Sequence, residues 1–243
     1  MAEFDMRIFG EDYLWFWESE LDDERSDRDA ELAWRLLGLE PGAEVLDLAC
    51  GHGRIANRLA AQGARVTGLD ATPLFLELAR RDADGRRVEV EYVEGDMREL
   101  PWESRFDAVL NWFTAFGYQD DDELRSILAG VRRALRPDGR FALETLSLPA
   151  LMERFRPFEV TERDGDFLLE LRGFDTIRSR SETEYVAIRR GEVRRYRASI
   201  RLFGFAELRD WLLAAGFARV EPFGSDGEPL TAEQQRMVAL AYA

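Results

Sequence analysis

Residues 45–53 read Val45-Leu46-Asp47-Leu48-Ala49-Cys50-Gly51-His52-Gly53, a short apolar strand that runs through an acid into a glycine-rich loop. The next segment, Ile55–Gln62, has a helical pattern that ends at Gly63. Glycines between a strand and a helix let a ligand approach the backbone, with N–H groups at the helix start pointing towards it. This stretch therefore predicts a nucleotide-like ligand at the end of a strand.

Strand and helix patterns alternate outward from this stretch. The predicted strands are Glu44–Leu48, Arg65–Asp70, Val88–Val93, Phe106–Asn111 and Arg140–Thr145. The predicted helices are Ile55–Gln62, Pro73–Arg81 and Asp121–Leu135, and the turn Arg136-Pro137-Asp138-Gly139 precedes the last strand. Strands and helices that alternate with short links indicate βαβ crossovers and a parallel sheet covered on both faces.

The pattern changes after Leu148 to segments that alternate between apolar and polar residues. Four such β segments are predicted, at Phe158–Glu162, Phe167–Phe174, Arg180–Ile188 and Val193–Leu202. The hairpin signals Asp164-Gly165-Asp166 and Arg190-Gly191 separate them, so this part is predicted to be an antiparallel insertion. A helix at Phe205–Ala215 and two closing strands, Ala218–Phe223 and Arg236–Ala243, follow it.

The N-terminal 29 residues are strongly acidic and also rich in aromatic side chains. A helix over Glu11–Glu20 would place Tyr13, Phe16 and Trp17 along one side, by the three-and-four spacing of helical neighbours. A second helix is predicted at Arg28–Leu37, where the following glycine can end it.

Composition argues against several classes of protein. The chain has 243 residues, a formal net charge of −15 and no lysine, so arginine supplies all 33 basic residues. Such a charge disfavours binding to a phosphate backbone, and nucleic acid is not an expected partner. No apolar run approaches the roughly 18 residues of a membrane span. The acidic N-terminus does not resemble a secretory signal, and the single cysteine fits a reducing compartment, so a cytoplasmic location is expected.

Acidic residues lie at the ends of three successive predicted strands. Asp47 would repel the pyrophosphate of a dinucleotide, but it suits a ligand with a cationic end, such as the amino and sulfonium groups of S-adenosylmethionine. Asp70 can accept hydrogen bonds from both ribose hydroxyls. Asp96 can accept one from an adenine amino group while Met97 packs against the ring. This set of acids indicates S-adenosylmethionine more specifically than the glycines alone do.

Five segments together carry a resemblance to a known family. They are Val45–Gly53, Gly68-Leu69-Asp70-Ala71-Thr72, Gly95-Asp96-Met97-Arg98-Glu99-Leu100-Pro101, Phe106-Asp107-Ala108-Val109 and Leu135-Arg136-Pro137-Asp138-Gly139-Arg140-Phe141. In this order they resemble the class I S-adenosylmethionine-dependent methyltransferases over most of residues 40–148. The resemblance implies a Rossmann-like α/β sheet of seven strands, the last antiparallel, with the cofactor over the carboxyl ends of the strands.

Later segments resemble a bacterial subgroup that methylates small molecules. They are the run Asn111-Trp112-Phe113-Thr114-Ala115-Phe116-Gly117-Tyr118, Arg201 with Glu207-Leu208, and the β insertion. Two positions depart from the family pattern: Asp138 stands where glycine is usual, and Ala115 replaces a frequent serine, which could alter substrate contacts.

The expected organisation has four parts. Residues 1–37 form an N-terminal helical lid, and residues 38–148 the S-adenosylmethionine-binding core. Residues 149–203 form the antiparallel β insertion, a cap or a dimerisation surface, and residues 204–243 complete the core sheet. The protein is expected to be a monomer, or a homodimer through the insertion.

The site residues follow from the motifs and the resemblance. The expected cofactor-binding residues are Asp47, Ala49, Cys50, Gly51, Gly53, Asp70, Ala71, Asp96, Met97 and Asn111. The expected substrate-binding residues are Tyr13, Trp17, Trp112, Phe116, Tyr118 and Arg201, although Arg201 could equally form a salt bridge within the insertion. No metal site is expected.

The predicted reaction is in-line methyl transfer to a small-molecule acceptor, at nitrogen or oxygen. A neutral amine needs no dedicated base, whereas a hydroxyl would, and His52, Tyr118 and Glu144 are the candidates for one. Two alternatives remain open: an NAD-dependent oxidoreductase on a similar sheet, and a non-catalytic module that binds S-adenosylmethionine.

Overall fold

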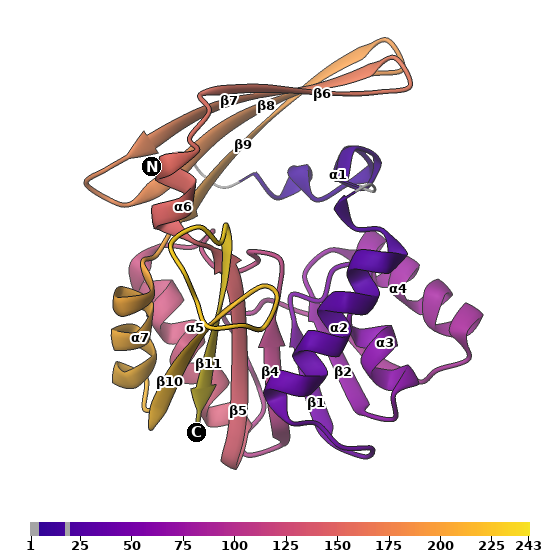
Figure 1. Cartoon of the computed structure of the whole chain (residues 1–243). Coiled ribbons are helices and arrows are strands. Elements are labelled where there is room, and N and C mark those ends of the chain that lie inside the picture. The colour runs from indigo at the N-terminus through magenta and orange to yellow at the C-terminus, as the bar shows by residue number, and fades with distance from the viewer. Residues whose placement is uncertain (1–4, 18–19) are drawn as a thin grey trace.

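The computed structural model describes residues 5–17 and 20–243, and its main element is a sheet of seven strands in the order β10-β11-β5-β4-β1-β2-β3 (Figure 1). The strands are β1 (Glu44–Leu48), β2 (Arg65–Asp70), β3 (Val90–Glu94), β4 (Phe106–Asn111), β5 (Leu135–Leu146), β10 (Arg219–Gly224) and β11 (Arg236–Tyr242). Strands β1 to β5 pair in parallel, whereas β11 runs antiparallel to both of its neighbours, β5 and β10. The predicted fold class is confirmed.

Helices cover both faces of this sheet (Figure 1). They are α2 (Asp23–Leu37), α3 (Ala56–Ala61), α4 (Pro73–Arg86), α5 (Asp121–Ala134) and α7 (Phe205–Ala214). One buried cluster joins the strands to α5 and α7, and a second joins them to α2 and α3. The two clusters make the central strands apolar on both sides, as expected of a doubly wound sheet.

Local signals explain where the helices begin. Helix α5 has a capping box, in which Asp120 and Glu123 each bond the backbone N–H of the other. Helix α2 begins at Asp23, earlier than predicted, because Asp22 accepts a hydrogen bond from the backbone N–H of Arg25 and acts as its N-cap.

The second sheet has four antiparallel strands in the order β6-β7-β8-β9. They are β6 (Phe158–Arg163), β7 (Asp166–Asp175), β8 (Arg180–Arg189) and β9 (Glu192–Arg201), as the alternating pattern predicted. In the β6–β7 turn both Asp164 and Gly165 have positive φ, of 52° and 83°, and the β8–β9 turn is similar. Such turns match the twist of paired strands.

The N-terminal segment lies beside the second sheet, over the carboxyl ends of the main strands (Figure 1). It contains the 3₁₀ helix η1 (Met6–Ile8) and helix α1 (Glu11–Trp17). Residues 1–4, and positions 18 and 19 of the helix predicted over Glu11–Glu20, lie outside the described residues.

Three elements differ from the sequence-based expectation. Helix α4 continues to Arg86 rather than Arg81, through a mostly charged segment in which Asp82 and Arg86, four residues apart, form an ion pair. The predicted turn at 136–139 is part of the irregular strand β5, and α6 (Leu148–Glu153) was not predicted. Within the described ranges, no helix is long and apolar enough to span a membrane.

Candidate active site

The loop after β1 turns sharply beneath the N-terminal segment. Ala49, Gly51 and Gly53 all have positive φ, of 58°, 55° and 78°. The Asp70 carboxylate, at the end of β2, accepts hydrogen bonds from the backbone N–H groups of Gly51 and Thr72, each at 2.8 Å. The ends of the first two strands are thus tied together by a carboxylate and backbone amides.

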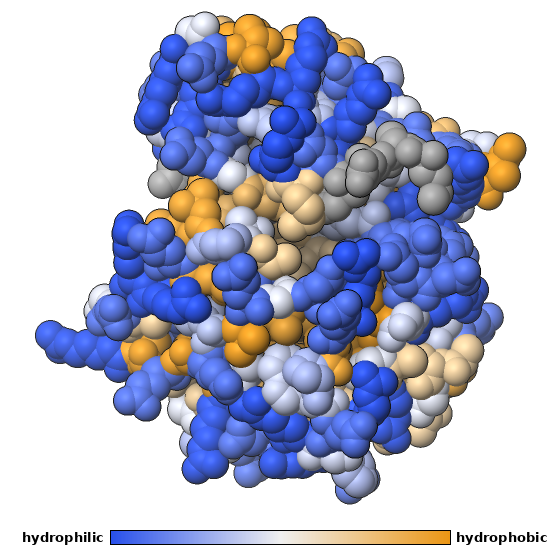
Figure 2. Space-filling model, turned by 180° about the vertical axis from the view of Figure 1, so that it is seen from behind, coloured by the Kyte–Doolittle hydropathy of each residue, from blue (hydrophilic) through white to orange (hydrophobic). Residues whose placement is uncertain are grey.

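The loop borders a cavity of about 1210 Å³ between the main sheet, the N-terminal segment and the second sheet. Figure 2 shows a hollow on the rear face, between the upper and lower parts of the molecule. Most of the sequence-predicted residues line this cavity: Tyr13, Trp17, Asp47, Ala49, Cys50, Gly51, His52, Asp70, Ala71, Asp96, Met97, Trp112 and Tyr118.

Asp47 is the most constrained acid of the cavity. Its side chain is buried, and its Oδ2 atom has no hydrogen-bond partner among the described residues. Burial raises its pKa to about 7, although the positive charge of Arg54 opposes the shift. An unpaired buried carboxylate is costly, so this oxygen suits a ligand that brings a cationic donor.

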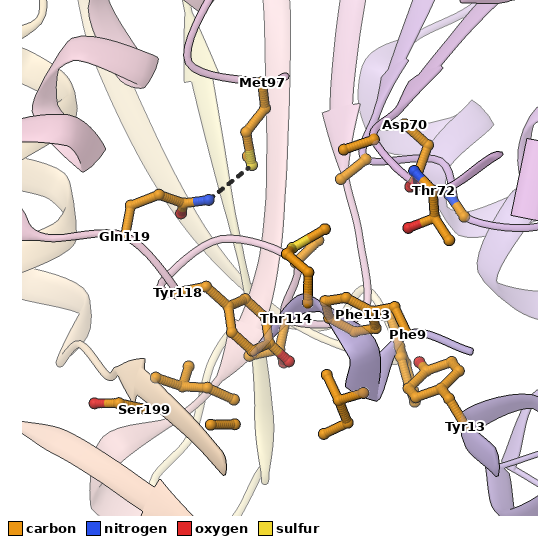
Figure 3. Close-up of a pocket in the computed structure, with 18 of the residues that line it drawn as sticks. Phe9, Tyr13, Asp70, Thr72, Met97, Phe113, Thr114, Tyr118, Gln119 and Ser199 are labelled. Carbon is orange, nitrogen blue, oxygen red and sulfur yellow. Dashed lines mark hydrogen bonds between the residues drawn. The ribbon is translucent and has the colours of Figure 1, made fainter. Parts of the chain in front are cut away.

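Asp70 and Asp96 have different surroundings. Burial raises the pKa of Asp70, although the hydrogen bonds that it accepts from backbone N–H groups lower it. Asp96 is bound by the guanidinium and backbone N–H of Arg98, whose hydrogen bonds lower its pKa. Met97 Sδ accepts a hydrogen bond from Gln119 at 3.6 Å, at the edge of the cavity (Figure 3).

Burial makes His52 and Cys50 poor ionising groups. The pKa of His52 is lowered to about 4, first by burial and then by the nearby charge of Arg54. The imidazole is therefore neutral at physiological pH and a weak proton acceptor. Burial and the carboxylates of Asp47 and Asp70 raise the pKa of the Cys50 thiol, which makes it a poor nucleophile.

Aromatic rings form the wall opposite the loop. Tyr13 stacks on Trp17 with centroids 5.0 Å apart, and Phe9 lies edge-on to both Tyr13 and Tyr118 (Figure 3). Tyr185, from β8, lies edge-on to Trp17 at 5.8 Å. Burial raises the pKa of Tyr13 to about 12 and that of Tyr118 well above its usual value. These phenols stay protonated at neutral pH.

Asn111 of the predicted cofactor set and Glu144 of the predicted base set lie outside the cavity lining. Asn111 is fully buried and donates to the Leu48 carbonyl at 2.8 Å, so it joins two strands instead of lining the cavity. Glu144 is also absent from the lining: it pairs with Arg236 and accepts the backbone N–H of Phe113. Both carboxylate oxygens of the candidate base Glu144 are therefore engaged by Arg236 or by the backbone.

Phe116, Arg201 and Gly53 are also absent from the cavity lining. Phe116 packs against a phenylalanine of the core, with ring centroids 5.9 Å apart. Arg201 forms ion pairs with Asp121 on α5 and Glu207 on α7, so its salt bridges join the insertion to the core instead of lying within the insertion. A Cβ atom on Gly53 would clash with the Tyr92 hydroxyl on β3 and lie 2.8 Å from the Cβ atom of Ala79 on α4, so only glycine fits where the loop packs between this helix and the sheet.

Sequence reasoning missed several residues of the lining, among them Phe9, Arg54, Phe75, Tyr185 and Arg236. Arg54 directly follows the glycine loop, and its position there was a usable signal. Tyr185 lies in a strand whose alternation predicts which residues share a face, but not which face meets the cavity.

The family follows from comparison with known proteins. Residues 45–139 match a family profile described as a methyltransferase domain. An uncharacterized methyltransferase from Synechocystis is 35% identical over 156 residues, which cover 58% of this chain and 71% of the relative. This chain belongs to the class I S-adenosylmethionine-dependent methyltransferases.

Further relatives agree with that membership. The demethylmenaquinone methyltransferase of Thermus thermophilus is 37% identical over 122 residues, 47% of this methyltransferase and 54% of the relative. Among solved structures, the CcbJ methyltransferase from Streptomyces caelestis has the same fold, with a TM-score of 0.83 and 22% identity over 99% of both chains. An amino pentose methyltransferase from Micromonospora echinaspora, solved with S-adenosylmethionine bound, has a TM-score of 0.68 and 25% identity over 93% and 95% of the chains.

Membership decides between the alternatives that the sequence left open. The protein is a methyltransferase enzyme with S-adenosylmethionine as its cofactor, rather than an NAD-dependent oxidoreductase or a non-catalytic binding module. The unpartnered buried oxygen of Asp47 fits this cofactor, because the amino-acid end of S-adenosylmethionine carries an ammonium group.

Proposed function

We propose that this methyltransferase transfers a methyl group to the nitrogen of a small-molecule amine bound in the aromatic part of the cavity. S-adenosylmethionine, when bound, supplies a methyl group already activated on a sulfonium. The protein then has to hold the acceptor nitrogen in line with that methyl group and keep water out. Positioning of this kind can contribute roughly 7–11 kcal/mol to lowering a barrier.

We place the cofactor along the ends of β1, β2 and β3. Asp47 would receive the ammonium group, and the backbone of the loop 49–51 would pass beside the amino-acid end. Asp70 and the neighbouring Ala71 would hold the ribose, and Asp96 with Met97 the adenine. All of these residues line one cavity, and their acids lie in the strand order that such an extended ligand requires.

The observation that carries the amine proposal is the chemistry of the aromatic wall. Its phenols Tyr13 and Tyr118 have raised pKa values, and the imidazole of His52 has a pKa of about 4. None of these groups is tuned to take a proton from a hydroxyl near neutral pH. A neutral amine brings its own lone pair, and aromatic rings attract the cation that forms on it. The amino pentose methyltransferase of similar fold is consistent with this proposal.

The test compares matched amines and alcohols as acceptors. The enzyme should methylate amines and leave the corresponding hydroxyl compounds unmodified, with S-adenosylhomocysteine measured by mass spectrometry. The rate should rise with pH as the acceptor ammonium loses its proton, and the inflection should move with the pKa of the amine chosen.

His52→Gln provides the control for a base-assisted alternative. Because the imidazole is already neutral and a weak base, the variant should keep kcat within about threefold. Methylation of alcohols that His52→Gln abolishes would instead favour oxygen transfer with His52 as the base.

We also propose that the N-terminal segment acts as a lid, within the four-part division 1–37, 38–148, 149–203 and 204–243. Phe9, Tyr13 and Trp17 come from this segment and form much of the aromatic wall. A substrate enclosed by them is kept from water, and the segment has to move for the substrate to enter.

We also propose that nucleic acid is not a partner and that the protein is either a monomer or a homodimer. A net charge of −15 disfavours nucleic acid. The protein could be a monomer or a homodimer through the second sheet, where Phe158 and Leu171 pair on one face and are 52% and 43% exposed. Apolar surface is visible at the top of Figure 2. Light scattering would distinguish the two states.

A further inference from the structure

Three arginine side chains gather around the ring of Phe113, in the wall of the cavity. The guanidiniums of Arg25, Arg54 and Arg236 lie 5.1, 5.4 and 4.9 Å from the centroid of this ring. Arg54, Arg236 and Phe113 line the cavity, and Figure 3 shows Phe113 among the lining residues. A ring face attracts a cation, but three cations at one ring repel one another. Such a cluster therefore needs anions close to it.

Two buried acids balance these three cations only in part. Asp29, on α2, pairs with both Arg54 and Arg25, at 2.7 and 3.9 Å. Glu144 pairs with the third arginine. Glu20 also pairs with Arg25, but 63% of its side chain is exposed, so solvent screens most of its charge. Three guanidiniums and two buried acids leave one positive charge at Phe113 without a buried partner.

Arg236 keeps a donor for a ligand. Its Nε and Nη2 atoms bind Glu144, and Nη2 also donates to the Thr114 hydroxyl at 2.8 Å, whereas Nη1 makes no hydrogen bond within the described ranges of the chain. Only 15% of the side chain is exposed. The backbone at the same place is strained, because Phe113 and Thr114 have left-handed φ, of 60° and 58°. Strain of this kind gathers at functional sites.

The Tyr13 hydroxyl experiences the unbalanced positive charge. Burial raises the pKa of this phenol to about 12, and the charge of Asp70 adds to the rise, but the charges of three arginines oppose it. They are Arg54, Arg236 and Arg25, the same three that surround the Phe113 ring. A protonated hydroxyl among cations favours an anion that accepts its hydrogen bond.

We propose that the acceptor carries a carboxylate as well as its amine, and that Arg236 Nη1 and the Tyr13 hydroxyl bind this carboxylate beside Phe113. A carboxylate has a single negative charge, which matches the unbalanced charge of the cluster, and a guanidinium suits it in geometry. The substrate class is then an amine and a carboxylate on one small molecule. This inference rests on the proposed function for the amine, and it adds the second group that the acceptor presents.

The test measures binding to the complex of the enzyme with S-adenosylhomocysteine, by isothermal titration. The probes are para-(aminomethyl)benzoate and para-(aminomethyl)benzamide, which share a ring and an amine and differ in the carboxylate. A charge-assisted hydrogen bond predicts that the benzoate binds about 10- to 100-fold more tightly than the benzamide. The corresponding phosphonate, which carries a larger negative charge, should bind no better than the benzoate.

Two variants test whether Arg236 is the donor. Arg236→Met combined with Glu144→Gln removes the cation together with the charge of its partner, and the new amide can still accept the Phe113 N–H. In this double variant the preference for the benzoate should fall below about threefold, while affinity for S-adenosylhomocysteine stays within about twofold. Glu144→Gln alone leaves Arg236 without its acid, so the preference should rise. A purely structural role for the pair predicts the same loss in both variants.

Arg178→Met is the matched control. Arg178 also lines the cavity, but it lies between β7 and β8, and 62% of its side chain is exposed. This variant should keep the full preference for the benzoate, which separates recognition beside Phe113 from the general charge of the cavity.

Several results would overturn the inference. Equal or absent binding of the benzoate and the benzamide would show that the cavity has no carboxylate site, and tighter binding of the phosphonate would assign the site to a phosphate. A double variant that keeps the preference would exclude Arg236 as the donor, and one that loses affinity for S-adenosylhomocysteine would assign the guanidinium to the cofactor.

Failure of the amine proposal has a different signature. Methyl transfer to para-(hydroxymethyl)benzoate but not to para-(aminomethyl)benzoate would refute nitrogen as the acceptor atom, and the preference for a carboxylate would stand.

Discussion

The buried carboxylate of Asp47 lowers the stability of the fold but is suited to binding a cationic ligand group. The folded protein holds this carboxylate in a buried position that raises its pKa to about 7 from a usual value of 3.8. The unfolded chain therefore loses this proton at a lower pH than the folded protein does. The contribution of Asp47 to folding stability falls as pH rises from about 4 to about 7, and stays low above that range. A residue kept at such a cost is best explained by what it binds.

Replacing Asp47 with asparagine should separate these two effects. Asp47→Asn should weaken S-adenosylhomocysteine binding by about 10- to 100-fold, because a charge-assisted hydrogen bond is lost. The unliganded variant should nevertheless melt at a higher temperature than the unmodified protein at pH 8, and by a smaller margin at pH 5. Titration calorimetry and scanning calorimetry at the two pH values measure both. Unchanged affinity for S-adenosylhomocysteine would contradict the assigned role of Asp47.

The sequence predicts which acidic residues meet at the site, but not how every neighbouring side chain is oriented. Asp47 and Asp70 end parallel strands, and Asp96 and Met97 follow the next one, so their convergence at one edge follows from topology alone. Asn111 ends such a strand too, but its side chain turns sideways to a neighbouring carbonyl. Which way a side chain turns depends on packing between elements distant in sequence, and the sequence pattern does not contain it.

Helix α1 depends on a single buried acid. Asp12 accepts hydrogen bonds from Arg189, Arg194 and Tyr196 of the second sheet. Burial alone would raise the pKa of Asp12, but these donors outweigh it, and the pKa is lowered. The stabilising effect is therefore present at neutral pH and is lost as pH falls through the lowered value. This contact holds the proposed lid to the sheet beside it.

Asp12→Ala should release the lid. Removing the acid leaves Arg189 buried without its main partner, and breaking a buried pair in this way costs about 3–5 kcal/mol. Backbone amides of α1 should exchange hydrogen faster, and kcat/KM for the acceptor should fall roughly tenfold.

Glu11→Ala, on the same helix, is the comparison variant for Asp12→Ala, because Glu11 is exposed and reaches Arg189 only through a long ion pair of 3.9 Å that contributes little. In this variant the backbone amides of α1 should exchange hydrogen at the rate of the unmodified protein, and kcat/KM for the acceptor should be unchanged. Full activity in Asp12→Ala despite faster exchange would show that α1 need not be closed.

Helices and strands with a regular apolar pattern are predictable from the sequence, and charged segments without such a pattern are not. The four strands of the second sheet follow from alternation and turn residues. The charged end of α4 and the short helix α6 have little apolar pattern, so nothing local distinguishes them from loops.

At the scale of the molecule, ligand binding should stabilise the whole fold, because the cavity is bordered by both sheets and the N-terminal segment. S-adenosylhomocysteine at about 100 times its Kd adds roughly 2.7 kcal/mol and should raise Tm by roughly 5–10 °C. NAD at the same concentration should leave Tm unchanged, because Asp47 repels its pyrophosphate. An equal shift with NAD, measured by differential scanning fluorimetry, would contradict the cofactor assignment.

Strand β11 lies inside the main sheet, between β5 and β10, although it follows both of them in the sequence. During vectorial synthesis on the ribosome, β5 and β10 emerge first and have no partner in common until β11 follows. Arg236, which begins β11, also pairs with Glu144 beneath Phe113. A nascent chain therefore cannot complete either its core sheet or the Arg236–Glu144 pair before β11 has left the exit tunnel, however early the other strands have folded.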